Sequence, residues 1–575
     1  MFSQNQIATI QIGPKATQLG AAYHYLESQQ FFDEEFEKQN NILHESLFQD
    51  YKSDIVVPRT LLFSFRGEIE ALNYISVTKI KEDKKNVNKH SENFDPMNPY
   101  DSLMQKENMR KLEHIQHETN FQKYALENNK FFHENNDKDL KKKIEKEKLK
   151  LQMEEDEKRK KALLNDNPYY DYVNQCMPKQ KYMHELYKTY ENDFHAYTSG
   201  KNSFLEKQED KDQIDDKIRL LLEENDYLNG FQIFADTDSG FGSFTNYILE
   251  VLHEECAKKA KFTIALTDKL NLINNSQAPQ YLQSVLAMND LLIQTELREK
   301  SSLLVPIDLN FINKCQYFNQ DFINKSEFNR MTALSLLVSN ITLPYRLKGN
   351  QGMDNIFNSI LPYRDLNIFS LIAQIPLVNS DETILDDKKH IIKYRENIRQ
   401  HQSSLSTAIF NGNLASFGES YTLRGPVKMP KGHKFDNKFD LKVTDQIIAT
   451  PQFMPPILCR EIIKFYTPEE HEEWHENEDE REKFKHKTSE KIKNVSNIEA
   501  FPMHSVLFSH ESLKYVLKNN INLYKTGDIN ANLRFQEDDF SREELMEVIN
   551  NAEQVFDNYT FSKQDHDEGD DESDE

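Results

Sequence analysis

Two glycines near the N-terminus lie where a phosphate group could bind. Gly13 and Gly20 fall within residues 11–20, between one apolar run that reads as a strand and a second that reads as a helix. Glycines let the backbone turn tightly and approach a ligand, and the free N–H groups of a following helix favour an anion. Pro14 has no N–H to donate, whereas Lys15 adds a cation. The pattern predicts a strand, a turn over residues 11–20 and a helix, with either an anion cradle or only a packing turn between them.

A second glycine-containing turn follows an apolar strand in the middle of the chain. Residues 230–236 read as this strand, and the segment Asp238-Ser-Gly240-Phe-Gly242-Ser-Phe244 leads into a helix. Gly240 and Gly242 could bring the backbone close to an anion, but phenylalanine cannot make the close approach that a diphosphate requires. The turn is therefore expected to keep the shape of a phosphate loop with altered chemistry.

Strands and helices alternate through the first half of the chain. Short apolar runs bounded by turn residues indicate strands, and apolar residues at helical spacing indicate helices. This alternation is typical of a parallel α/β sheet. The last helix begins at Ser541-Arg-Glu-Glu544, a capping-box pattern. The expected strands are residues 7–10, 60–65, 230–236 and 262–266, and the expected helices lie near residues 21–29, 247–253, 281–294, 328–339 and 541–559.

The composition describes a large acidic protein with packed and solvated segments. The chain has 575 residues, 38% hydrophobic and 29% charged, with a formal net charge of −24. This length allows about two to four domains, because single cores stop growing beyond roughly 250–300 residues. A chain this acidic is not expected to bind nucleic acid or anionic lipid.

The cysteines and the N-terminus indicate a reducing compartment. Cys176, Cys256, Cys315 and Cys459 show no CxxC pair or regular spacing, which argues against a disulfide framework or a thiolate zinc site. No segment combines a basic start with an apolar core at the N-terminus, and none approaches the roughly 18 apolar residues of a spanning helix. The expectation is a cytoplasmic protein, soluble or peripherally attached to a membrane.

Charged segments interrupt the apolar pattern. The Lys-rich stretch at residues 138–150 reads as a solvated helix, with contact to an anionic membrane as the alternative. The acidic C-terminal tail either provides solubility or binds a basic partner surface. The expected organisation is residues 1–77 and 163–325 as two parts of a nucleotide-type N-terminal domain, 78–162 as a charged insertion, 326–467 as a second domain, 468–495 as another charged insertion, 496–563 as C-terminal strand and helices, and 564–575 as the tail.

The segment His471-Glu-Glu-Trp-His475 fits the HExxH zinc pattern, in which two histidines bind the metal and the glutamate is a base. Its surroundings are acidic, with no apolar stripe and no evident third ligand. A solvated face with Trp474 as an anchor or partner contact is the better interpretation. No metal site is expected.

The order of these segments resembles the tubulin superfamily, and in detail its divergent Misato family. The resemblance covers the chain apart from the charged insertions. It implies an α/β, tubulin/FtsZ-like fold with a Rossmann-like parallel-sheet N-terminal domain, a second α+β domain, C-terminal helices and long charged insertions. The segments that carry it are residues 10–13 and 18–21, Pro58-Arg59-Thr60, Phe65-Arg66-Gly67, Asp171-Tyr172-Val173, residues 226–232, Ser239-Gly240, Thr342-Leu-Pro-Tyr-Arg346 and Arg424-Gly425.

Carrying the tubulin nucleotide positions onto this chain records mostly losses. Gln18 matches a nucleotide-contacting glutamine, and Asn329 matches the asparagine that reads guanine. Ser64 and Arg66 stand where tubulins place acids around the nucleotide and its magnesium, so a hard cation would lose oxygen ligands. Asp354 is a nearby but uncertain match for the activating acid. The implied residual nucleotide site consists of Gly13, Gln18, Gly20, Gly240, Gly242 and Asn329, with no catalytic residue and no metal ligand.

Lys15 and Arg66 are two cations near the former phosphate site. They could bind an anion, or they could pair internally with an acid such as Asp236 or Asp238. Internal pairing is the arrangement favoured here.

The resemblance implies a non-enzymatic, tubulin-like scaffold in mitochondrial distribution, inheritance and morphology, located in the cytoplasm or peripherally on the mitochondrial outer membrane. The implied partners are tubulin, other cytoskeletal proteins or a chaperonin, and no cofactor is required. Two alternatives remain open. One is a GTP-binding, filament-forming GTPase, and the other is a tubulin-folding or assembly factor.

Overall fold

The computed structural model divides the chain into two compact units. One consists of Met1–Gln49, Val57–Ile69 and Met177–Glu575, and the other of Asp50–Val56 and Glu70–Cys176. Both expected charged insertions, the HExxH segment and the acidic tail lie outside the described residues. The structure describes residues 5–31, 42–50, 56–65, 183–186, 194–205, 208–314, 320–324, 327–347, 352–361, 363–374, 403–404, 416–424, 442–448, 452–453, 500–501, 503–538 and 540–560.

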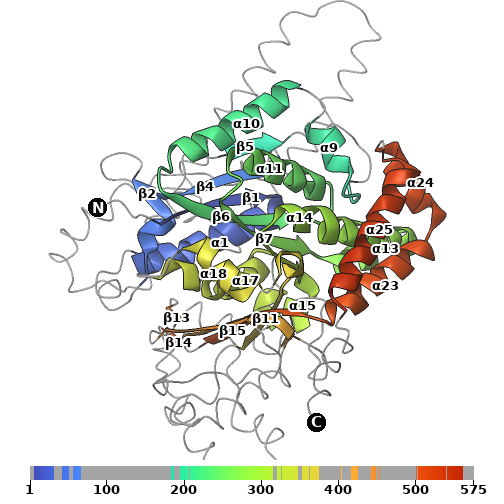
Figure 1. Ribbon diagram of the computed structural model, residues 1–575. Coiled ribbons are helices and arrows are strands. Elements are labelled where there is room, and N and C mark those ends of the chain that lie inside the picture. Colours follow the sequence, from blue (N-terminus) through green and yellow to red (C-terminus); the bar gives the residue numbers. More distant parts are fainter. Residues whose placement is uncertain are drawn as a thin grey trace, which may run out of the picture. The chain divides into compact units, whose positions relative to one another are not determined.

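A six-stranded sheet with parallel pairing throughout forms the centre of the first unit (Figure 1). Its buried strands carry apolar residues on both faces, as expected for a sheet covered by helices on each side. The predicted parallel α/β sheet is confirmed. The strand order is β5 (Met183–Leu186), β4 (Thr60–Phe65), β1 (Gln6–Ile12), β6 (Leu228–Asp236), β7 (Ala260–Thr267) and β8 (Leu303–Asp308).

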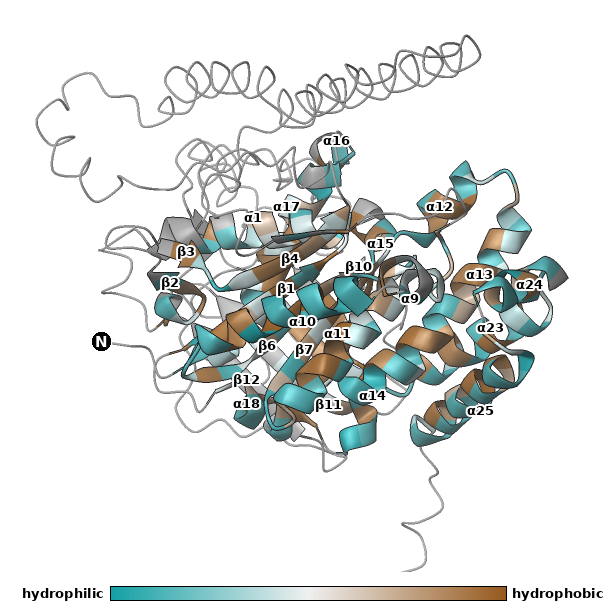
Figure 2. Cartoon of the chain, turned by 90° about the horizontal axis from the view of Figure 1, so that it is seen from above, coloured by the Kyte–Doolittle hydropathy of each residue, from teal (hydrophilic) through white to brown (hydrophobic). Residues whose placement is uncertain are grey.

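Alternation along the strands assigns each face of this sheet to different helices. Ile10 and Ile233 belong to the core that includes α10 (Gln208–Glu223) and α11 (Phe241–Glu255). Phe234, one position on, instead contacts the ring of Tyr23 in α1 (Pro14–Phe31), with centroids 5.7 Å apart. Because the period is two residues, α1 and α11 lie on opposite faces. Figure 2 shows the hydrophobic colour along strands of the sheet and on α11.

The first helix begins earlier than the sequence pattern indicates. The expected turn over residues 11–20 is wrong, because α1 starts directly after Gly13. Pro14 occupies the first helical position, where its missing N–H leaves no bond unmade and its fixed φ suits the helix. Gly20 is therefore inside the helix, and α11 likewise starts at Phe241 rather than near residue 247.

The remaining helices of this unit connect and cover the strands. Helix α13 continues into a π-helical turn, and Pro279 stands at its start, where proline is favoured. These elements are α9 (Ser199–Phe204), α12 (Lys269–Asn275), α13 (Pro279–Leu292), η3 (Ile293–Leu297), α14 (Arg298–Lys300), α15 (Leu309–Lys314), α16 (Gln320–Ile323), α17 (Glu327–Ile341), η4 (Leu343–Arg346), α18 (Met353–Ile360), η5 (Arg364–Leu366) and η1 (His44–Ser46).

A second, mixed sheet contacts α17. Asn340 of this helix donates to Ser505 Oγ (2.8 Å) and to the carbonyl of Thr422 (3.1 Å), so two strands are tied to one helix side chain. The strand order is β10 (Ser403–Ser404), β9 (Ser370–Gln374), β15 (Met503–His510), β11 (Ser416–Arg424) and β12 (Lys442–Ile448), and two further pairs are β2 (Phe48–Asp50) with β3 (Val56–Pro58) and β13 (Gln452–Phe453) with β14 (Ala500–Phe501).

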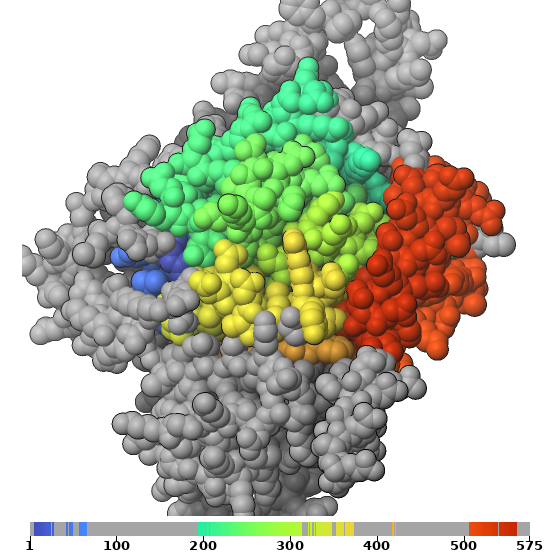
Figure 3. Space-filling view, viewed as in Figure 1, coloured from blue at the N-terminus to red at the C-terminus, as the bar shows by residue number. Residues whose placement is uncertain are grey.

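Three C-terminal helices pack against α13 and the π-helical turn (Figure 3). They are α23 (Leu513–Lys525), α24 (Ile529–Glu537) and α25 (Arg542–Asn558). The predicted capping box is confirmed, because Ser541 accepts from the backbone N–H of Glu544 while the Glu544 carboxylate accepts from that of Ser541. In the part of the chain that the structure describes, no helix is both long and apolar enough to span a bilayer.

Candidate functional site: a helix N-terminus occupied by an internal carboxylate

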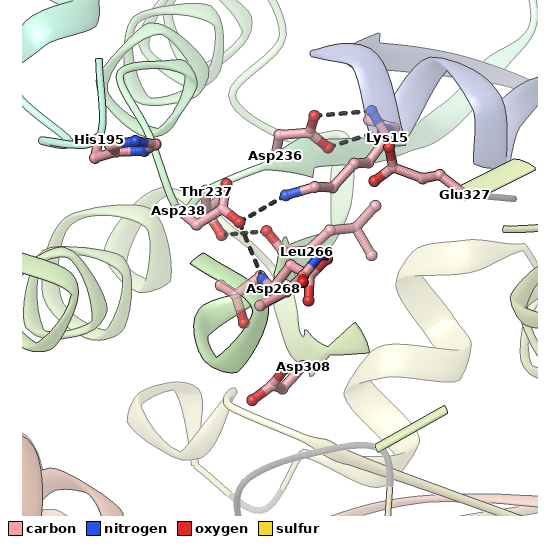
Figure 4. A network of polar contacts seen from close by, with 12 residues as sticks. Lys15, His195, Asp236, Thr237, Asp238, Leu266, Asp268, Asp308 and Glu327 are labelled. Atoms are coloured by element: carbon pink, nitrogen blue, oxygen red, sulfur yellow. Dashed lines mark hydrogen bonds and ion pairs between the residues drawn. The ribbon is translucent and has the colours of Figure 1, made fainter. Parts of the chain in front are cut away.

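A carboxylate of the chain itself occupies the N-terminus of α1. The backbone N–H of Lys15 donates to Asp236 Oδ2 (2.9 Å), and that of Ala16 donates to Oδ1 (2.8 Å) (Figure 4). Asp236 ends β6, the strand next to β1 in the sheet, so the parallel register brings it to this position. Unpaired N–H groups at a helix start are where an anion would bind. Here Asp236 is that anion.

The position of the Asp236 carboxylate requires a glycine at residue 13. Its φ is 97°, which side-chain-bearing residues rarely adopt, and a Cβ added there would lie 2.6 Å from Asp236 Oδ2. Its N–H donates to the carbonyl of Phe63 (2.8 Å) and its carbonyl accepts from the N–H of Thr17 (2.9 Å). The close backbone approach predicted for a ligand is therefore used by a side chain of the same protein.

Lys15 pairs internally, as predicted. Its Nζ lies 2.7 Å from Asp238 Oδ2, with 16% and 5% of the two side chains exposed. Burial lowers the pKa of Lys15, but the neighbouring carboxylates, Asp238 foremost, outweigh burial and raise it overall. Burial also raises the pKa of Asp236 well above its usual range, against the opposing charge of Lys15. Arg66, the other cation considered, lies outside the described residues.

The ion pair extends into a network that the sequence did not indicate. Asp238 Oδ2 also accepts from the backbone N–H of Asp268 (3.0 Å), and Asp268 Oδ2 lies 2.7 Å from Arg330 NH2. Arg330 is in turn 3.4 Å from Glu327. Neither Asp268 nor Arg330 was singled out from the sequence. Their positions could have indicated them, because Asp268 comes directly after the strand β7 and Arg330 follows Asn329 in α17.

The second turn is filled by backbone and aromatic groups. The N–H of Gly240 donates to the carbonyl of Phe194 (3.0 Å), and a Cβ at Gly242 would lie 2.2 Å from the ring of Tyr197. Phe241 is 2% exposed and contacts an aromatic cluster, with ring centroids 4.8–5.5 Å away. The rings of this cluster are Phe65, Phe194 and Phe204.

The remaining residues of the expected nucleotide site, Gly20, Gln18 and Asn329, lie in the helices α1 and α17. Gly20 lies within α1, where a Cβ would meet the Gln11 side chain at 2.1 Å, so its role is helix-to-strand packing. Gln18 is half-buried in the same helix, and its Oε1 has no hydrogen-bond partner among the described residues. Asn329 is 1% exposed near the start of α17.

Ser64 and Asp354, the positions considered for magnesium and for hydrolysis, lie in different elements. Ser64 is buried in β4. Asp354 lies in the first turn of α18. Burial raises its pKa, and the charges of Lys259 and Lys261 on the same chain oppose this shift. Among the residues that the structure describes, no group of three His, Cys, Asp or Glu side chains is placed to hold a metal ion.

Motif residues behind the resemblance hold the fold together. Arg346 is fully buried and binds the Glu27 carboxylate through both terminal nitrogens, at 2.5 and 2.9 Å, which ties η4 to α1. Arg59, between β3 and β4, donates to Asn225 Oδ1 (2.6 Å). Breaking a buried ion pair such as Arg346–Glu27 by removing one partner costs about 3–5 kcal/mol.

Part of the chain is similar in sequence to known proteins. The tubulin domain family matches residues 174–347. Protein DML1 of Coccidioides immitis (strain RS) is 30% identical over 189 residues, 33% of this chain and 34% of that protein. Protein dml1 of Aspergillus clavatus is 27% identical over 182 residues, 29% of this chain and 35% of that protein. The tubulin alpha-2 chain of Caenorhabditis elegans is 27% identical over 190 residues, 32% of this chain and 39% of that protein. The chain thus spans between a third and two-fifths of the length of these relatives.

The parallel sheet, its two glycine turns and these matches support a tubulin-like fold and a divergent relationship to the tubulin superfamily. Within that superfamily the matched third of the chain is similar to the DML1 proteins, which supports a divergent protein of the Misato type.

Proposed function

We propose that the chain is a non-enzymatic, tubulin-like scaffold that does not depend on a bound nucleotide. The observation that carries the proposal is the Asp236 carboxylate on the N-terminus of α1. A nucleotide phosphate would have to displace a carboxylate that accepts two backbone N–H bonds. These hydrogen bonds favour the carboxylate while the burial of its charge offsets part of that gain, so displacing it would cost about 1–2 kcal/mol.

Charge opposes a phosphate at the same place. Lys15 is already paired with Asp238, and Arg330 is paired with Asp268. A phosphate entering here would meet buried carboxylates whose cations are engaged, and like charges at short range are unfavourable in a site shielded from water. The residues present therefore do not fit the phosphates of GTP, and no catalytic step is assigned to the site.

The scaffold would act in mitochondrial distribution, inheritance and morphology, from the cytoplasm or the mitochondrial outer surface. The similarity to the DML1 proteins and the resemblance to the Misato family support this role. The match to a tubulin alpha chain supports tubulin, another cytoskeletal protein or a chaperonin as partner. Loss of the protein is expected to disturb mitochondrial distribution in dividing cells, scored by microscopy, and normal distribution would count against the role.

The nucleotide content of the purified full chain tests the proposal directly. The protein is denatured and the released small molecules are separated by chromatography, with purified tubulin as the positive control. The expected result is far less than one guanine nucleotide per chain. Stoichiometric GTP or GDP would overturn the proposal.

A filament-forming GTPase is the alternative that Gln18 favours, since its buried Oε1 lacks a hydrogen-bond partner among the described residues and could meet a ligand. Asp354 is then the acid to test. In that case Asp354→Ala would abolish a measurable GTPase rate, whereas the scaffold proposal expects no rate in the wild-type protein. A third reading, a tubulin assembly factor, is separated by pull-down of purified tubulin with the chain lacking residues 78–162 and the tail.

A further inference from the structure

Residues 194–204, here called the strap, cover the second glycine turn. The carbonyl of Phe194 accepts from the N–H of Gly240 (3.0 Å), and the N–H of Lys201 donates to Ser243 Oγ (3.0 Å). Gly200 lies so close that an added Cβ would be 1.7 Å from the carbonyl oxygen of Gly240. The strap thus contacts the first turn of α11 through backbone atoms at both of its ends.

The middle of the strap is held by α13 and by the C-terminal helices. Asn289 of α13 accepts from the N–H of Tyr197 (2.8 Å) and donates to the carbonyl of His195 (2.7 Å). The hydroxyls of Thr198 and Ser199 both donate to Asp538 Oδ2, at 2.7 and 3.1 Å. Arg534 donates to Asp538 Oδ1 (2.8 Å) and to Ser199 Oγ (2.7 Å). The side chains of Arg534 and Asp538 are only 11% and 9% exposed. Thr198, Ser199, Arg534 and Asp538 are here called the clasp, and they join segments 340 positions apart in the chain.

The clasp includes the C-terminal end of α24, so a shift of this helix would displace Asp538. Asp538 caps the C-terminus of α24, and the helix contacts α13 on one side while Leu533 on another side is 52% exposed. In Figure 1 this helix lies among the C-terminal helices at the margin of the described unit. Terminal elements with exposed faces open more readily than core strands.

We propose that the strap is a closure over the Gly240–Gly242 turn that Asp538 holds shut, so that displacement of α24 releases it. Release would uncover the N-terminus of α11 and the rings of Phe194, Phe204 and Phe241, which now pack together. The C-terminal helices then control access to the second glycine turn. This coupling goes beyond the proposed function, because it does not depend on whether nucleotide binds.

Hydrogen exchange of the full chain tests the coupling, with Asp538→Ala and the conservative Asp538→Asn. The expected result is about tenfold faster exchange at residues 194–204 and in the first turn of α11, because buried charge-assisted bonds are lost while the core remains closed. Exchange in β6 and β7 should be unchanged. Tryptic cleavage after the exposed Lys201 should accelerate in parallel.

Glu537→Ala is the matched control. This carboxylate is 3.8 Å from the same Arg534 but is 67% exposed and has no hydrogen bond to the strap among the described residues, so its removal should leave strap exchange at the wild-type rate. The reciprocal variant Gly200→Ala should speed exchange in α24, since coupling between two sites is mutual. Exchange at residues 194–204 that stays at the wild-type rate in both Asp538 variants would overturn the proposal, whether or not Gly200→Ala folds.

Discussion

The two strand–turn–helix units of the sheet fill the same kind of space in different ways. At the first turn, the N–H groups of α1 bind the carboxylate of Asp236, so charge replaces charge. At the second turn, the N–H of Gly240 binds a backbone carbonyl and Phe241 enters an aromatic cluster, so packing replaces charge. A glycine turn before a helix can thus be filled either by an internal anion or by packed side chains that cover it.

The two turns differ in whether a single substitution could allow them to bind an anion. Removing a carboxylate leaves a helix N-terminus beside a lysine, which still favours an anion. Removing an aromatic side chain leaves an apolar cavity that offers an anion nothing. The first turn is therefore the one where a single substitution could restore ligand binding, and the second is the one where it could only weaken the fold.

The largest effect is expected for Phe241→Ala at the second turn. Truncating a buried phenylalanine costs about 3–5 kcal/mol through lost burial and the cavity left behind. Chemical denaturation should show this loss, and added phosphate should not restore it. The control Tyr363→Ala removes an aromatic side chain that is 73% exposed and should leave stability nearly unchanged. A loss as small as that control would mean that the second turn is not held by packing.

The first unit should lose stability in acid through His24 of α1. Burial lowers the pKa of this imidazole from 6.5 to about 4. A lowered pKa contributes stability that is present above pH 6.5 and is lost as the pH falls toward 4, by about 3 kcal/mol at about 1.4 kcal/mol per pKa unit. Denaturation of wild type and His24→Gln at both pH values should show a steeper acid loss in wild type. Equal losses would contradict a buried neutral His24.

A smaller effect, about 2–3 kcal/mol, is expected for Gly13→Ala. Alanine at this position must adopt a strained positive φ, and its Cβ must push against the Asp236 carboxylate. Combining it with Asp236→Gly should relieve the clash, so the double variant should be more stable than the sum of the two single losses predicts. Strict additivity in denaturation experiments would show that Gly13 serves the turn alone and not Asp236.

The smallest loss, about 1–2 kcal/mol, is expected for Asp236→Ala, because burial already disfavours its charge while its N–H bonds favour it. Inorganic phosphate at millimolar concentration should raise the melting temperature of this variant and not of wild type, since a ligand stabilises only the state that binds it. The exposed Asp226→Ala at the start of β6 serves as control. Equal phosphate stabilisation of all three proteins would remove the distinction between the two turns.

Several features were accessible from the sequence because they depend on local order. The alternation of strands and helices predicted the parallel sheet, the capping box at Ser541 was explicit, and an internal acid was foreseen for Lys15. The start of α1 was misjudged because Gly20 was taken as a turn signal, although a glycine packed against Gln11 is tolerated inside a helix. The nucleotide positions at Gln18 and Asn329 stay predictions.

The sequence by itself predicted the parallel sheet, the order of its main strands and helices and the final helix, since periodicity, proline and glycine positions and residue types are local properties. The loss of phosphate-loop chemistry stays a prediction. Only the tertiary structure decided which groups occupy the two turns. Asp236 meets α1 because neighbouring parallel strands end at one edge of the sheet, and Asp538 meets Ser199 because helices distant in sequence pack together. Such contacts depend on three-dimensional register, which residue spacing along the chain does not encode.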